Sequence, residues 1–341
     1  GEILVRATDR AILFTAAEKL DVIVSGAGKL SVTESDGLSI SADLAELEFF
    51  RTKGAGDVSL AALGHIALTD VLLANGSFTV DAGGNLTNEV LSLLSDGNEI
   101  SLKTAGSMNL GEVDAGLAGK ISVFSGGSFH ALGKGLKAKE LQLTAEGDVF
   151  ADVSVAEAVI RVAGSGDVYL KEADTLQLSD ANLSDGSLTV ESGGDLRVSQ
   201  ASTEGVARKI SLDAQGGSLF VGEVDFGVNG NGRLAASGSV EQIRGKRFVA
   251  GQAEVFAGDD VALVTSLDEI SLNATGDVAV SDSGAITVRE LRTEKGLVAL
   301  ETTGNLNVGT LSFAQNVEAN QVSILTKGGG NLIVGSLNAG S

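Results

Sequence analysis

Residues 186–198 of the chain read Gly-Ser-Leu-Thr-Val-Glu-Ser-Gly-Gly-Asp-Leu-Arg-Val. Two short segments of this stretch alternate apolar and polar residues, one around Leu188 and one around Leu196, and the pair Gly193-Gly194 lies between them. Alternation of this kind is typical of a strand with one buried face. A single copy would equally fit a β-hairpin, because two strands joined by a glycine turn are a common hairpin pattern. The choice between these folds depends on the rest of the chain.

The same arrangement recurs along most of the chain. Two apolar positions lie eight residues apart around a turn, and successive first positions lie roughly 20 to 28 residues apart. Repetition at this spacing is typical of a solenoid, in which each repeat stacks on its neighbour and like positions form columns. The apolar pairs are Ile100 and Met108, Ile121 and Phe129, Leu141 and Val149, Ile160 and Val168, Leu188 and Leu196, Ile270 and Val278, and Val298 and Leu306, with Ile210 and Leu219 and then Val322 and Leu332 spaced slightly wider.

A third, weaker apolar segment follows the pair, as in residues 152–155, 222–226 and 289–291. We therefore expect about three short strands per coil and roughly 20–22 residues per coil. A chain of β-hairpins is the alternative, but hairpins would not require a third segment at a constant place. Because crossovers between parallel strands are almost always right-handed, the predicted fold is a right-handed parallel β-helix, formed by residues 1–341 as a single β-solenoid. The pattern breaks at 225–252, where we expect an irregular coil or a protruding loop.

The composition agrees with this fold and restricts the function. The chain has 46 glycines and no proline, as expected where nearly every strand is paired on both sides. It has no cysteine, which excludes disulfides and cysteine-ligated metal sites. A formal net charge of −21 argues against a nucleic-acid partner, because phosphate binding requires a basic face. No apolar run reaches the length of a membrane span.

The repeats at 76–86, Gly-Ser-Phe-Thr-Val-Asp-Ala-Gly-Gly-Asn-Leu, and at 120–129, Lys-Ile-Ser-Val-Phe-Ser-Gly-Gly-Ser-Phe, resemble a known class. They are similar to the β-helical shaft repeats of large bacterial surface proteins of the filamentous-haemagglutinin type. The resemblance covers most of the chain and implies an exported, extended protein, extracellular or on the bacterial cell surface, that is adhesive or forms fibres. The secretion domains of that class carry Asn-Pro motifs, which a chain without proline cannot contain. The resemblance is therefore to the shaft.

The residue after the turn glycine is regularly small and polar. Such residues satisfy backbone groups at turns, which accounts for most of the pattern. Three of them, Asp148, Asp167 and Asp195, would nevertheless fall on consecutive or nearly consecutive coils of a stack, where their charges repel one another. A Ca²⁺ ion would relieve that repulsion, because it binds carboxylates and carbonyls from several segments. These three residues form the candidate metal site, and no other cofactor is expected.

Four basic residues cluster in or next to the break in the pattern: Arg233, Arg244, Lys246 and Arg247. Basic residues in an acidic solenoid commonly serve to neutralise nearby carboxylates. Because this cluster coincides with the irregular coil, it is also the candidate contact for an acidic partner or a neighbouring copy of the chain.

The function expected from these observations is structural and non-enzymatic: a rod or shaft segment, or a fibre-forming subunit, that stacks head to tail on itself or on adjoining repeats of a longer chain. One alternative is an adhesin that contacts a host or cell-surface glycan or protein through the irregular coil. A second alternative is a polysaccharide-active enzyme, for which acidic pairs such as Asp259/Asp260 and Asp268/Glu269 are the candidates. No catalytic residue is predicted, because the chain has no tryptophan and one tyrosine to stack on a sugar and no convergent reactive set.

Overall fold

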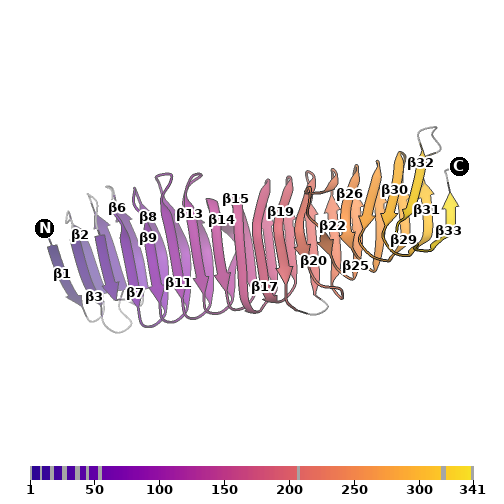
Figure 1. The fold of residues 1–341 in the computed structure, drawn as a ribbon. Helices are drawn as coiled ribbons and strands as arrows, with labels where there is room; N and C mark the ends of the chain where they lie inside the picture. The colour runs from indigo at the N-terminus through magenta and orange to yellow at the C-terminus, as the bar shows by residue number, and fades with distance from the viewer. Residues whose placement is uncertain are drawn as a thin grey trace. The chain divides into compact units, whose positions relative to one another are not determined.

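The structure is a computed structural model that describes residues 2–7, 10–15, 19–24, 29–34, 39–43, 46–52, 56–205, 208–315 and 320–338. All regular secondary structure in these residues is β, in 33 strands, so the described part of the chain contains no helix that could cross a membrane. The residue contacts group into two compact units, residues 1–170 and 171–341, which are described separately (Figure 1).

The first unit contains the strands up to the boundary. Its strands are β1 (Glu2–Ala7), β2 (Arg10–Thr15), β3 (Lys19–Val24), β4 (Lys29–Glu34), β5 (Ser39–Asp43), β6 (Glu46–Thr52), β7 (Val58–Ala62), β8 (Ile66–Leu73), β9 (Phe78–Ala82), β10 (Leu86–Leu93), β11 (Glu99–Thr104), β12 (Met108–Asp114), β13 (Lys120–Ser125), β14 (Phe129–Ala145) and β15 (Val149–Ser165), and β16 (Val168–Glu172) contains the boundary.

The second unit contains the remaining strands. They are β17 (Leu176–Asp185), β18 (Leu188–Ser192), β19 (Leu196–Thr203), β20 (Lys209–Ala214), β21 (Leu219–Asp225), β22 (Asn231–Ala236), β23 (Val240–Gln242), β24 (Phe248–Val249), β25 (Gln252–Ala257), β26 (Val261–Ser266), β27 (Glu269–Ala274), β28 (Val278–Asp282), β29 (Ile286–Thr293), β30 (Leu297–Thr302), β31 (Leu306–Phe313), β32 (Gln321–Thr326) and β33 (Leu332–Asn338).

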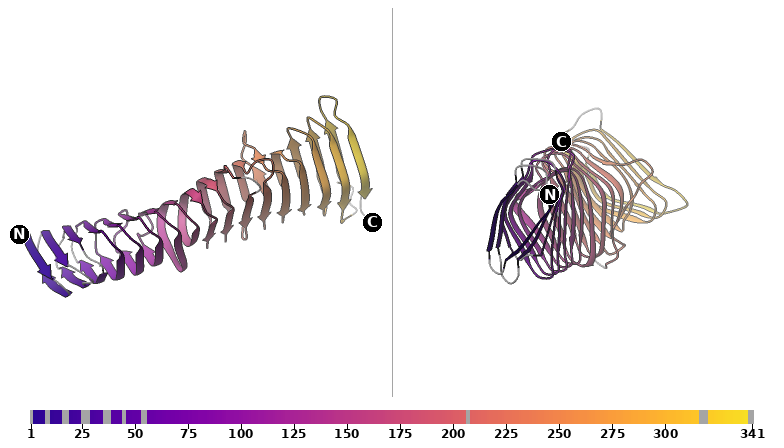
Figure 2. Two further views of the ribbon diagram at one scale, coloured as in Figure 1. Left: turned by 90° about the horizontal axis from the view of Figure 1, so that it is seen from below. Right: turned by 90° about the vertical axis from the view of Figure 1, so that its left-hand side faces the viewer.

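Every strand pairing within the units is parallel and joins a strand to its equivalent in the next coil (Figure 2). The coil is therefore a turn of a parallel β-solenoid, as predicted, and the hairpin alternative is excluded. In the first unit one interior column reads Val58, Phe78, Ile100, Ile121 and Leu141. A second column reads Ile66, Leu86, Met108, Phe129 and Val149, and both columns are fully or almost fully buried.

The predicted third segment is the second half of a longer strand that turns a corner. In β10, Leu86 and Asn88 are buried, the alternation then shifts phase, and Leu91 and Leu93 are buried. The Asn88 side chain bridges this corner to the next coil: its Nδ2 donates to the carbonyl of Glu112 at 2.9 Å, and its Oδ1 accepts from the N–H of Gly111 at 3.1 Å. A β-carbon at Gly111 would lie 2.3 Å from the carbonyl oxygen of Glu89, so the close approach of the coils at this corner requires glycine.

The coils differ in length although their strands stay in register. Equivalent turn positions are 17 residues apart from Asp260 to Asp277 and 26 residues apart from Asn305 to Asn331, around the predicted 20–22. The additional residues lie in the turns, because a strand paired on both sides cannot lengthen without a bulge in its neighbours.

The variable coil length places two residues in a column that the sequence pattern did not predict. Val298 and Val322 were expected to be first members of their pairs, in the column of Leu188. They instead stack in the column of Leu196, through Leu219, Val240, Val261 and Val278. The expectation was wrong because a spacing of eight residues occurs at more than one junction of the coil, so spacing alone does not fix the column.

In the second unit, the region 225–252 contains a strand that is interrupted and then resumes. Val240 and Glu241 of β23 pair with β26, and Phe248 of β24 pairs with the same strand further along. The chain between them leaves the sheet (Figure 2). Phe248 is fully buried, and its ring lies 2.5 Å from the point where a β-carbon of Gly232 would stand, so it fills the interior at the position where the column has no side chain.

We predict that a charge in an interior column destabilises the solenoid, whereas the same charge one residue later does not. Leu196 is fully buried between Leu176 and Leu219, while Arg197 is exposed. Leu196→Asp should lower the free energy of unfolding of the second unit by at least about 3 kcal/mol, because it removes apolar packing and buries an unpaired carboxylate. Arg197→Asp should change it by less than about 1 kcal/mol. Urea denaturation checks both variants, and equal midpoints would contradict the assignment.

Candidate functional site

The small polar residues after the turn glycine form a ladder along the turns. In the second unit the N–H of Asp195 donates to Thr175 Oγ1 at 3.3 Å, and the N–H of Ser218 donates to Asp195 Oδ1 at 2.8 Å. The N–H of Ser239 donates in turn to Ser218 Oγ at 3.2 Å. Each of these side chains thus accepts a hydrogen bond from the main chain of the next coil, at the corner where the direction of the main-chain ladder changes.

The candidate calcium ligands lie in two ladders of this kind. In the first unit the N–H of Asp167 donates to Asp148 Oδ1 at 2.9 Å, so these two residues lie on consecutive coils with a direct hydrogen bond between them. Asp195 lies at a different turn of the coil, because it precedes β19 and stacks on Thr175 before β17, whereas Asp167 precedes β16, which pairs with β18. The structure therefore does not bring Asp195 into the column of Asp148 and Asp167. Among the residues that the structure describes, no three histidine or acidic side chains come together as a metal site would require. The ladders give the carboxylates of Asp148 and Asp195 a role that needs no metal, and calcium binding stays a prediction.

Buried hydroxyl groups lie beside the turns in both units, and the sequence analysis missed them. Ser125 Oγ lies 3.2 Å from the carbonyl oxygen of Gly106 and 3.1 Å from that of Ser128, and Ser192 Oγ lies 2.5 and 3.0 Å from those of Asp174 and Asp195. The hydroxyls therefore satisfy turn carbonyls of their own and the preceding coil. The signal in the sequence is a Ser or Thr at an inward phase two residues before the turn glycine.

Asp282 is a buried carboxylate of the second unit, with 2 % of its surface exposed. Its Oδ2 accepts from Thr265 Oγ1 at 2.7 Å and from the N–H of Leu267 at 3.0 Å, and its Oδ1 accepts from the N–H of Gly284 at 2.8 Å. It stacks directly between two buried hydroxyl residues of the adjacent coils, Thr265 and Thr302. Three donors to the two oxygens satisfy this group, as a buried carboxylate requires, and indicate a role in holding the turn.

The acidic pairs considered for an enzyme also have partners. Asp260 Oδ1 accepts from the N–H of Asp277 at 2.7 Å, as part of the ladder. Glu269 Oε2 lies 2.6 Å from Nε of Arg289 on the next coil. These contacts engage one carboxylate of each pair in the stacking of the coils.

In the first unit, an ion pair raises the pKa of Lys137. Its Nζ lies 2.8 Å from Asp114 Oδ2, and this hydrogen bond and charge raise the pKa, with smaller contributions from Asp96 and Glu112, while desolvation acts in the opposite direction. A pKa higher in the folded than in the unfolded chain contributes stability below about pH 10, which is lost as the pH rises through the folded value. The lysine side chain is 46 % exposed, so solvent screening keeps this contribution small.

The predicted contact residues divide into two groups. Arg233 lies on β22, where its guanidinium is 5.3 Å from the centre of the Phe256 ring and 3.6 Å from Asp213. Arg244, Lys246 and Arg247 lie together on the chain between β23 and β24, and all three are exposed. None of these three forms an ion pair with any residue that the structure describes. They are the cationic group of the second unit that is free to meet a partner.

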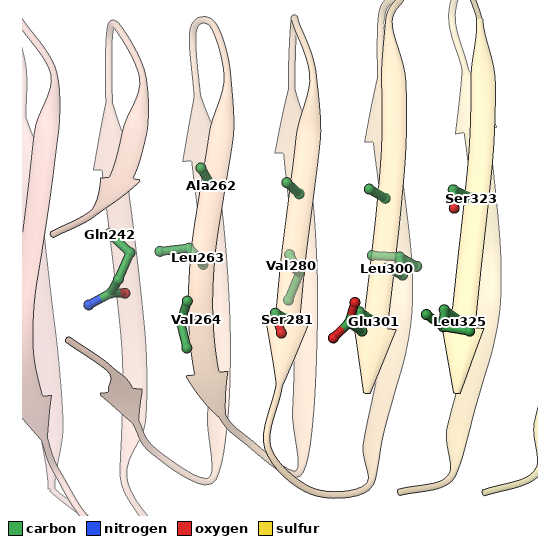
Figure 3. A pocket seen from close by; sticks show the side chains of 12 residues that line it. Gln242, Ala262, Leu263, Val264, Val280, Ser281, Leu300, Glu301, Ser323 and Leu325 are labelled. Carbon is green, nitrogen blue, oxygen red and sulfur yellow. The ribbon is translucent and has the colours of Figure 1, made fainter. Parts of the chain in front are cut away.

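A groove of about 400 Å³ lies beside that cationic segment, on the outer face of β26, β28, β30 and β32 (Figure 3). Its outward residues are mostly small or apolar, among them Ala262, Val264, Ala279 and Leu325. The sequence analysis did not find it, because the hollow depends on which outward positions of successive coils stand side by side.

A scan against protein-family models, a search of curated proteins and a search of solved structures return no match to this chain. The function is therefore argued from the residues and the geometry of the solenoid alone.

We predict that the ladder depends on an acceptor atom and not on a charge. Asp195→Ala removes the acceptor of the Ser218 N–H and should destabilise the second unit by about 1 kcal/mol, because a lost hydrogen bond at a solvated turn costs about that much. Asp195→Asn keeps an acceptor oxygen and should stay close to wild type. Thermal unfolding in EDTA and in Ca²⁺ measures both effects. An alanine variant as stable as wild type would contradict the ladder, and a Ca²⁺-dependent gain lost in the asparagine variant would instead support the calcium site.

Proposed function

We propose that the chain is a non-enzymatic structural protein, a shaft segment or fibre subunit that extends by stacking coil on coil. One observation carries the proposal. Leu332, Val334 and Leu337 of β33 pair with Leu306, Val308 and Leu311 of β31, so they continue interior columns. The three residues of β31 are at most 1 % exposed, whereas those of β33 are 46, 41 and 54 % exposed.

The outer side of this coil combines two features that favour a further coil. Within the described residues, β32 pairs only with β30 and β33 only with β31, so each leaves one row of main-chain groups without a strand partner. Such an edge is a template for another strand. Burying the apolar residues beside it under a further coil would lower the free energy of the assembly. A coil of the same kind, from a second copy or from adjoining repeats of a longer chain, meets both requirements.

We infer the location of such a shaft from the resemblance of its repeats. The repeats resemble those of exported bacterial surface proteins, and the described residues present carboxylates that hold turns. We therefore place the proposed shaft outside the cell or on the bacterial surface, with further coils as its main partner. The net charge of −21 keeps such a shaft soluble and argues against nucleic acid as a partner.

A second candidate function, an adhesin that contacts a receptor or glycan through the irregular coil, is favoured by a separate observation. Arg244, Lys246 and Arg247 are exposed on a segment that leaves the sheet, in a chain that is otherwise strongly acidic. This candidate is compatible with a shaft, because the segment lies on a face of the second unit and not on its last coil.

We predict that stacking depends on the inward residues of β33. Wild-type chain should form end-to-end oligomers whose size rises with concentration in light scattering. Val334→Asp, which places a charge in the column above Val308, should abolish them without changing the urea midpoint of the coils before β30.

Ile333→Asp is the matched control, because Ile333 lies on the same strand but in the outward column of Asn307. It should leave the oligomers intact. A wild-type chain that stays monomeric at all concentrations, or equal effects of the two variants, would contradict coil-on-coil stacking.

A further inference from the structure

The segment from Gln242 to Arg247 is an insertion in one strand position of the second unit. Glu241 pairs with Ala262, and Phe248 pairs with Thr265. Six residues therefore stand opposite two, and the extra chain is forced out of the sheet next to Val264. The N–H of Lys246 donates to the carbonyl of Ile243 at 3.0 Å, and Gly245 has a φ of +77°. The insertion is thus a closed turn that presents Arg244, Lys246 and Arg247 at a defined place.

The groove begins where this turn leaves the sheet. Its floor follows two outward columns across four coils, one through Ala262, Ala279, Ala299 and Ser323 and the other through Val264, Ser281, Glu301 and Leu325 (Figure 3). Short side chains in the first column leave the hollow, and Val264 and Leu325 remain 44 and 47 % exposed beside it. A mostly apolar hollow of about 400 Å³ with few polar groups is typical of a binding site.

Gln242 forms the end of the groove nearest the insertion. Its Nε2 donates to the carbonyls of Val221 at 2.8 Å and Gly222 at 2.6 Å, which fixes the amide group. Its Oε1 is buried, and no donor among the described residues reaches it. Figure 3 shows this oxygen on the side of the amide that faces β26. A buried acceptor without a donor favours a ligand that brings an N–H.

The charges next to the groove favour an acidic ligand. Arg244, Lys246 and Arg247 have no carboxylate partner among the described residues, whereas Glu301 at the other end of the groove is already paired with Lys327. The chain as a whole is negative, but at physiological salt exposed charges beyond about 8 Å are largely screened. Glu241 is exposed directly beside Ala262 at the head of the first column and opposes these cations with one negative charge. The three cations outnumber it, so the local charge at this end of the groove still favours an acidic ligand.

We propose that this groove binds an extended acidic peptide whose residues alternate between apolar and carboxylate side chains. Its apolar side chains lie on the two outward columns, one of its main-chain N–H groups donates to Gln242 Oε1, and its carboxylates meet the basic turn. The peptide packs on the face of the sheet and does not add a strand, because β28 and β30 are already paired on both sides. A glycan is disfavoured, because no aromatic residue lines the groove to stack on a sugar.

This inference rests on the second candidate function and is independent of stacking at the last coil. The test measures binding of three fluorescent probes to the full chain by anisotropy: an eight-residue Val-Glu repeat peptide, oligo-glutamate of equal charge, and a sulfated polysaccharide. The Val-Glu peptide should bind at least roughly tenfold more tightly than oligo-glutamate, because only it covers the apolar floor.

Two variants locate the binding. The triple variant Arg244→Glu, Lys246→Glu, Arg247→Glu should weaken binding of the Val-Glu peptide at least roughly tenfold and remove most of its salt dependence. Ala279→Gln fills the groove without changing charge and should weaken it as well. The control triple variant Lys139→Glu, Lys171→Glu, Arg197→Glu makes the same change in net charge at exposed positions away from the groove and should bind as wild type.

Each other outcome overturns the proposal in a distinguishable way. If the polysaccharide binds and the Val-Glu peptide does not, with the same sensitivity to the basic turn, the peptide is the wrong ligand and the adhesin function stands. If no probe binds at low salt, or if the control variant weakens binding as much as the basic-turn variant, the groove is not the site and the adhesin candidate loses its support.

Discussion

The main-chain ladder between parallel coils is the constraint on which the rest of this structure depends. Each amide must find an acceptor in a neighbouring coil, and at the turns, where the ladder changes direction, side chains supply some of these acceptors. Asp195 does this for Ser218, and Asp148 does it for Asp167. The absence of proline and the small polar residue after the turn glycine follow from the same requirement, since proline has no N–H and a long side chain would not return to the main chain.

The ladder also changes the interpretation of the many acidic residues of the chain. A formal charge of −21 suggests electrostatic function, such as cation binding or catalysis by paired carboxylates. Many of the carboxylates instead hold main-chain N–H groups, as Asp260 and Asp282 do, or pair with a cation on the adjacent coil, as Glu269 does. An acceptor can be Asn, Ser or Thr at the same position, so the choice of aspartate at some turns adds negative charge and self-repulsion.

The fold could be predicted from the sequence because the alternation of apolar and polar residues and the spacing of the repeats can both be recognised in the order of the residues. The buried phases of Leu188 and Leu196, the parallel stacking and the interruption before Phe248 can all be recognised in the residue pattern. The column of Val298 could not, because coils of 17 to 26 residues let the same spacing occur at different junctions. The groove could not be predicted from the sequence either, since it depends on which outward residues of four coils stand side by side.

The insertion at Gln242–Arg247 shows why a solenoid can acquire a binding surface without losing its core. Stacking requires only that a strand leave its pairing and resume it, and β21 and β26 both pair with β23 before the insertion and with β24 after it. The interior is completed by Phe248, which fills the space left by Gly232. Since the side chains of Arg244, Lys246 and Arg247 are exposed and lie outside the core, their charge can vary at little cost in stability. The residues of the proposed binding surface and the residues of the interior columns are therefore different residues of the same coil, and the basic turn can change in sequence while the columns on both sides of it stay constant.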